Sequence, residues 1–126
     1  MDWKEMKEFA GIDLNDSFVL SWNYGKQNIL IELEASVWPE SKHYKALKCG
    51  EYTCYRKAII EVTNAKSVEG MLKQESAEPI IDPDGSEDYG NIDSLSVING
   101  CFNITGAFGN VSVEGGELKF FFIDDQ

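Results

Sequence analysis

Three two-residue turns near the C-terminus constrain the fold of this chain more than any other feature. They are Asn99-Gly100, Gly109-Asn110 and Gly115-Gly116. Asn-Gly and Gly-Gly pairs favour the positive φ angles that tight β-hairpin turns require. Turns at these positions divide residues 92–123 into four short segments, in which apolar and polar residues alternate. We therefore expect a four-stranded antiparallel meander with one apolar face.

Folding the segments about these turns predicts which residues lie opposite one another. The expected pairs are Val97 with Phe102, Leu95 with Ile104, Phe108 with Val111, Gly106 with Val113, Val113 with Leu118, and Val111 with Phe120. All of these residues fall on one side of the sheet, so that side should be buried. Turn chemistry, register and the apolar face agree with one another, which is the strongest structural signal in the chain.

Earlier segments also have the alternation of half-buried strands. Residues 18–24 and 29–37 alternate on either side of a turn at Gly25-Lys26, and residues 51–62 resume the pattern. On the strand of residues 29–37, the alternation places the acidic side chains toward solvent. A second antiparallel hairpin is therefore expected before the meander.

Two segments have a different spacing. In residues 2–9 the apolar residues recur every three positions, which predicts a short amphipathic helix. Residues 64–78 are ambiguous, and their apolar residues could form a helical turn. About seven strands and one short helix place residues 1–126 in a single, mainly-β domain. Because each one-sided sheet must bury its apolar face, we expect an antiparallel β-sandwich or a curled, partly closed β-barrel with a short N-terminal helix.

The formal net charge of −11 is unevenly distributed. Residues 76–126 hold ten acidic residues and one basic residue, whereas residues 41–75 hold four acidic and seven basic residues. An acidic excess repels phosphates, so it opposes binding to nucleic acid or to anionic membranes. The same charge would attract a basic protein and speed the encounter. The alternative is that the charge serves solubility alone.

Other features of the composition indicate the compartment. No stretch approaches the roughly 20 apolar residues of a membrane span, and the N-terminus lacks the basic start and apolar run of a signal peptide. We expect a cytoplasmic protein in which Cys49, Cys54 and Cys101 are free thiols. Cys49 and Cys54 with His43 fall short of the four ligands of a structural zinc site, so no metal or other cofactor is expected.

An acidic loop supplies the candidate binding residues. Within it, Asp82, Asp84, Ser86 and Asp88 alternate as in the first half of a calcium-binding loop. Glu87 stands where that motif needs a glycine, so the loop is predicted to be a solvated turn. The residues expected to bind a partner are Asp82, Asp84, Glu87, Asp88 and Tyr89.

Few residues indicate catalysis. His43 is the only histidine, and nothing in the spacing places it beside a nucleophile and a third, orienting group. Arg56 and Asp93 each share the parity of apolar residues on their strands. They could form a buried ion pair, occupy separate positions at the rim of the sheets, or bind a ligand. We do not expect an enzyme.

Several stretches together resemble a known group of proteins. They are Asp88 to Leu95, Phe102 to Gly109, and the strand opening Asp16 to Trp22. These stretches resemble small acidic bacterial domains of unknown function, some of which are similar to the immunity proteins that neutralise polymorphic toxins. The resemblance implies an inhibitor and supplies no catalytic residues.

Three functions follow from these observations. The leading hypothesis is a non-enzymatic binding protein, an immunity-type inhibitor that binds a basic protein through its acidic surface. The alternative is a small-molecule carrier with an aromatic-lined β-barrel cavity, and a hydrolase is the third. A large enclosed apolar pocket would favour the carrier, whereas a flat acidic surface would favour the inhibitor.

Overall fold

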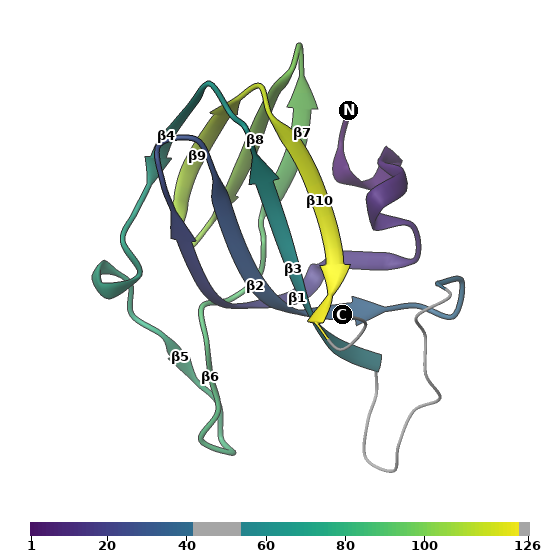
Figure 1. Ribbon diagram of the computed structural model, residues 1–126. Coiled ribbons are helices and arrows are strands. Elements are labelled where there is room, and N and C mark those ends of the chain that lie inside the picture. Colours follow the sequence, from purple (N-terminus) through teal and green to yellow (C-terminus); the bar gives the residue numbers. More distant parts are fainter. Residues whose placement is uncertain (42–53, 124–126) are drawn as a thin grey trace.

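The protein is built from two four-stranded antiparallel sheets that face each other (Figure 1). The computed structural model describes residues 1–41 and 54–123. The first sheet has the order β1 (Ile12–Tyr24), β2 (Ile29–Val37), β3 (Cys54–Thr63) and β10 (Glu117–Phe122). The second has the order β4 (Ser67–Met71), β9 (Gly109–Glu114), β8 (Cys101–Gly106) and β7 (Ser94–Ile98). The predicted mainly-β, antiparallel class is confirmed.

The apolar core lies between the sheets and receives side chains from both. Fully buried residues include Leu33 and Ile60 from the first sheet and Leu95, Ile104 and Val111 from the second. The two sheets do not close into a barrel. Burying two apolar faces against each other satisfies both sheets without closure.

The first half of the predicted meander is confirmed. Across the Asn99-Gly100 turn, Leu95 lies opposite Ile104 and Val97 lies opposite Phe102. The turn chemistry and the alternation of the two strands are local properties, and they specify the same pairing.

The second turn of the meander lies two residues earlier than predicted. Ile104 pairs with Val111, so the chain turns at Ala107-Phe108 and the predicted pairing of Phe108 with Val111 is wrong. Gly109 lies outside the turn, at the start of β9, where it pairs with Met71 of β4. A glycine is required there because a Cβ would collide with the backbone oxygen of Gly70. Phe108 turns inward and is fully buried.

The fourth strand leaves the meander. β10 pairs with β3 of the other sheet, with Phe120 opposite Ile60, and β9 pairs with β4 instead. The predicted pairs of Val113 with Leu118 and of Val111 with Phe120 are therefore wrong. Gly115-Gly116 carries the chain from one sheet to the other, and a Cβ at Gly116 would crowd the Thr63 backbone oxygen at 2.8 Å.

The predicted N-terminal helix is replaced by two 3-10 turns, η1 (Trp3–Glu5) and η2 (Lys7–Phe9). Between them Met6 has an extended backbone, which interrupts any longer helix. Trp3, Met6 and Phe9 are nevertheless buried in the core. Their spacing of three residues is the period of a 3-10 turn, which explains why the expected apolar face forms without an α-helix.

The β1–β2 hairpin forms as predicted, but a bulge changes which residues of β1 face inward. The register shifts between Val19 and Ser21. Before the bulge Ser17 and Val19 are buried and Phe18 is half-buried, whereas Trp22 beyond it is buried. An extra residue in one strand reverses the alternation, so the predicted single face from residue 18 to residue 24 is wrong.

The ambiguous segment 64–78 contains strand β4 and the 3-10 turn η3 (Gln74–Ser76). Cys54 and Cys101 are free cysteines.

Asp93 is exposed before β7, whereas Arg56 is half-buried in β3 with its guanidinium carbon 4.7 Å from the centre of the Phe122 ring. Because Asp93 is exposed, the two residues do not form a buried ion pair. Residues His43 and Cys49 lie outside the described residues.

Candidate functional site

Between β4 and β7 the chain leaves the two sheets and forms a projecting arm, residues 72–91 (Figure 1). The arm contains η3 and a two-stranded ribbon, in which β5 (Ile80–Ile81) pairs with β6 (Glu87–Asp88). All of the residues predicted to bind a partner lie in this arm: Asp82, Asp84, Glu87, Asp88 and Tyr89. The structure therefore brings them together on one element.

The returning side of the arm is fixed to the open edge of β1. The Val19 N–H donates to the Gly90 carbonyl at 2.8 Å, and the Tyr89 N–H donates to the Val19 carbonyl at 2.8 Å. The Asn91 side-chain amide donates to the Ser17 carbonyl at 2.8 Å. These bonds satisfy backbone groups that an edge strand would otherwise leave open to another chain.

The outgoing side of the arm is fixed to the same strand through Trp22. The Trp22 backbone N–H donates to Oε1 of Gln74 at 2.9 Å, and its indole N–H donates to the Leu72 carbonyl at 2.7 Å. The Trp22 and Tyr89 rings meet edge to face, with centroids 5.0 Å apart. Both sides of the arm therefore have a defined position at its base.

Hydrogen bonds within the tip define its turn. The Asp82 N–H donates to the Ser86 carbonyl at 2.9 Å, and the Gly85 N–H donates to the Asp82 carbonyl at 2.9 Å. The Ser86 hydroxyl donates to Oδ1 of Asp84 at 2.6 Å, and the Ser86 N–H donates to the same oxygen at 2.9 Å. These bonds stabilise the charged carboxylate, so they hold the pKa of Asp84 below its ordinary value. Asp84 is therefore ionised at neutral pH.

The five predicted residues do not share one role. Asp84 and Glu87 are exposed and Asp82 is half-buried. Asp88 is only 8% exposed, and its Oδ1 accepts from the Gly90 N–H at 2.8 Å. The expectation of an exposed charge at Asp88 is wrong, because this carboxylate caps the backbone where β6 meets β1. Tyr89 is half-buried against Trp22, so it is part of the support of the arm.

Two apolar residues of the arm were not among the site candidates that the sequence pattern predicted. Ile80 is 54% exposed and Ile81 is 67% exposed, in the strand that leads to the acidic tip. The signal was an apolar pair placed directly between Pro79 and the acidic loop. Alternation could not reveal their exposure, because a two-residue strand has no repeating pattern.

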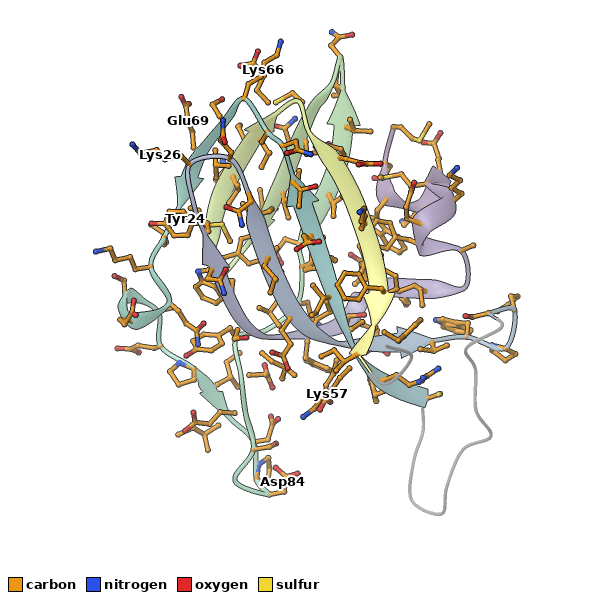
Figure 2. All side chains as sticks on the ribbon, viewed as in Figure 1. Tyr24, Lys26, Lys57, Lys66, Glu69 and Asp84 are labelled. Carbon is orange, nitrogen blue, oxygen red and sulfur yellow. The ribbon has the colours of Figure 1, made fainter. Side chains whose placement is uncertain are left out.

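An open depression of about 940 Å³ lies at the base of the arm. It is lined by Trp22, Asn23, Tyr24, Lys73, Gln74, Glu75 and Tyr89. Figure 2 shows Tyr24 beside the sheets and Asp84 at the far tip of the arm. The depression opens to solvent, so it is not the enclosed cavity that the carrier hypothesis requires.

Comparison with known proteins adds no relative: no family model, no curated protein and no solved structure matches this chain. The resemblance to immunity-type domains therefore stays a prediction. In residues 1–41 and 54–123, no group of three or more His, Cys, Asp or Glu side chains is placed to hold a metal ion. Within the same ranges, no helix is long and apolar enough to cross a membrane.

Proposed function

We propose that this chain is a non-enzymatic binding protein that recognises a basic protein through its arm, in the manner of an immunity-type inhibitor. The observation that carries the proposal is the geometry of the arm. An acidic tip projects from the two sheets, while the base of the arm is fixed to β1 on both sides. Such a projection can block a functional surface of its partner.

Charge supports a basic partner. The arm has one basic residue, Lys73, and six acidic residues: Glu75, Glu78, Asp82, Asp84, Glu87 and Asp88. At physiological salt, screening acts over a Debye length of about 8 Å. At the projecting tip, the positive potential of the basic side chains on the rest of the molecule is therefore largely screened. A concentrated negative field of this kind speeds the encounter with a positive surface.

The fixed base supports recognition in a second way. Binding costs free energy when a loop must be ordered at the interface. The arm is already held by the hydrogen bonds of Val19 and Trp22, and its tip is held by those of Ser86. Less ordering is then required when the partner binds.

The test measures association with a candidate basic protein, chosen from the products of the reading frames adjacent to the gene. The arm variant D82N/D84N/E87Q removes three negative charges from the tip. The control variant E5Q/E114Q/E117Q removes the same number from exposed positions away from the arm. Glu114 lies next to Lys66, which donates its backbone N–H to the Glu114 carbonyl, and Figure 2 places Lys66 at the opposite end of the molecule from Asp84.

We expect stopped-flow association of the arm variant to be slower by about tenfold at low salt, because charges at an interface rim act mainly on the encounter. The control should stay within about twofold of the native rate, and added salt should reproduce the defect in the native protein. Rates that do not change with salt or with either variant would mean that the charge serves solubility alone.

A further inference from the structure

We infer that the depression at the base of the arm binds an extended segment of another protein, which adds as a strand to the free edge of β1 at Tyr24. The inference goes beyond the proposed function, because it involves neither the acidic tip nor its charge. The ligand of this second site is a polypeptide backbone that carries one large apolar or aromatic side chain.

The backbone of β1 alternates in direction, and this places the groups of Tyr24 on its outer edge. The Trp22 N–H points outward, since it donates to the side chain of Gln74. The Gly25 N–H points the other way, since it donates to the Asn28 carbonyl in the β1–β2 turn. Successive residues of a strand alternate between its two edges. Both bonds therefore put the Tyr24 N–H and carbonyl on the edge away from β2.

The arm covers this edge in steps and stops before Tyr24. Val19 exchanges backbone hydrogen bonds with Tyr89 and Gly90 of the arm. At Trp22, a side-chain amide of η3 takes the place of a strand carbonyl. Within the described part of the chain, β1 pairs with β2 alone, and nothing hydrogen-bonds to the Tyr24 N–H or carbonyl. Unpaired backbone groups on a strand edge are a template for another strand, and many domains bind extended peptides in this way.

The depression opens where this coverage ends. Its volume of about 940 Å³ falls within the range of about 300–1,000 Å³ that is typical of ligand sites. Tyr24 lines it and is 40% exposed, and Figure 2 shows this side chain on the side of the molecule where the chain leaves β4 for the arm. Trp22 and Tyr89 line it as well, with their rings in contact. An open backbone edge and an aromatic-lined depression therefore lie at one place.

The register of an added strand indicates the side chain that it carries. Residues directly opposite each other in a pair of strands have their side chains on the same face, and aromatic pairs are favoured there. Tyr24 and Trp22 are two residues apart, so they share the face that lines the depression. The residue opposite Tyr24 would therefore pack against aromatic rings, which suits a large apolar or aromatic side chain. Lys73 and Glu75 also line the depression with opposite charges, so a charged side chain gains little there.

A second copy of this chain is a poorer occupant than a different protein. Each copy has a net charge of −11, and the acidic arm is fixed to the same strand edge. Joining two β1 edges would bring the arms of both copies together, and like charges oppose such association.

The test uses short linear peptides displayed on phage, which are selected on the full chain and counter-selected on the variant Y24A. The best peptide is synthesised as the probe, both unmodified and N-methylated at each backbone position in turn. Its Kd is measured by fluorescence anisotropy for the native chain, Y24A and Y55A. Tyr55 is the matched control, because it is 38% exposed on β3 and does not line the depression.

We expect N-methylation to weaken binding by about tenfold or more at every second position of the bound stretch, since only alternate N–H groups of the peptide face the edge. This readout changes the peptide alone, so it does not depend on the folding of a variant. Amide exchange at Tyr24 should become slower when the peptide binds, whereas exchange at Asn23, whose N–H faces β2, should not change. Y55A should stay within about twofold of the native Kd.

Three outcomes would overturn the inference. The first is a selection that yields no peptide dependent on Tyr24. The second is N-methylation without alternation and unchanged exchange at Tyr24, which would mean that the depression holds a side chain and no strand. The third is a dimer of the native chain that sedimentation equilibrium detects and Y24A abolishes, which would make a second copy the occupant. None of them involves the arm variant D82N/D84N/E87Q, so the proposed function is tested separately.

Discussion

The β7–β8 hairpin and the β5–β6 ribbon are both antiparallel pairs closed by short turns, yet they have opposite places in the molecule. In the hairpin, Leu95 and Ile104 lie opposite each other and are fully buried. In the ribbon, Ile80 and Ile81 are largely exposed, and the pair projects away from both sheets (Figure 1). Turn chemistry makes a hairpin in both cases, and burial decides whether that hairpin supports the core or extends from it.

The difference also shows how an isolated ribbon is stabilised. A two-stranded pair is marginal in water unless it packs on another element. Both isoleucines of the ribbon are exposed, and its position depends on the hydrogen bonds that join the arm to β1.

The largest effect should come from the buried hairpin. Leu95→Ala removes a fully buried side chain, and we expect a loss of about 2–5 kcal/mol in the free energy of unfolding. The exposed counterpart Ile81→Ala should change it by less than about 0.5 kcal/mol. Urea unfolding of both variants measures the difference. Equal losses would show that the ribbon belongs to the core.

The attachment of the arm should give the next largest effect. Gln74→Ala removes the acceptor of the Trp22 N–H, and an unsatisfied buried donor costs about 1–3 kcal/mol. Amide hydrogen exchange at Trp22 should become faster, while exchange at Leu95 should change less. Gln27→Ala is the control, because Gln27 is exposed. Unchanged exchange at Trp22 would mean that the side chain of Gln74 does not hold the arm.

Asp88 should matter for stability although its neighbours at the tip do not. Asp88→Ala leaves the Gly90 N–H without its acceptor, and we expect a loss of about 1 kcal/mol. Glu87→Ala, at an exposed position of the same strand, should leave the urea midpoint unchanged. A larger loss of stability in Glu87→Ala than in Asp88→Ala would contradict the assignment of Asp88 to the support of the arm.

The smallest effect concerns the pKa of Asp84. Its pKa is lowered in the folded protein, so the associated stabilisation is present above the ordinary carboxyl pKa and is lost as the pH falls through the lowered value. Ser86→Ala removes the hydroxyl donor, and the pKa of Asp84 should move up toward its ordinary value. NMR titration of the Asp84 carboxyl measures the shift. An unchanged pKa in the variant would show that the hydroxyl does not cause it.

Local patterns were sufficient for the elements in which turn chemistry and alternation agree. The β7–β8 register follows from Asn99-Gly100 and from the alternation of the flanking strands. The buried face of β2 follows in the same way from Ile29 to Ala35, whereas Ser36, which the alternation places toward solvent, is buried. The acidic composition likewise predicted that Asp82, Asp84 and Glu87 would lie together at the surface.

Tertiary contacts decided the features for which several local solutions were available. β10 could have continued the meander by its pattern, but β4 occupies the edge of β9 and β3 offers an open edge to β10. The separation of Asp88 from the exposed acids depends on where β6 meets β1. The exposure of Ile80 and Ile81 follows from the place of the ribbon outside the two sheets. Alternation specifies which face of a strand is apolar. It does not specify which strand pairs with which, because strand edges far apart in the sequence can pair with the same strand. Only the packed structure shows which pairing forms.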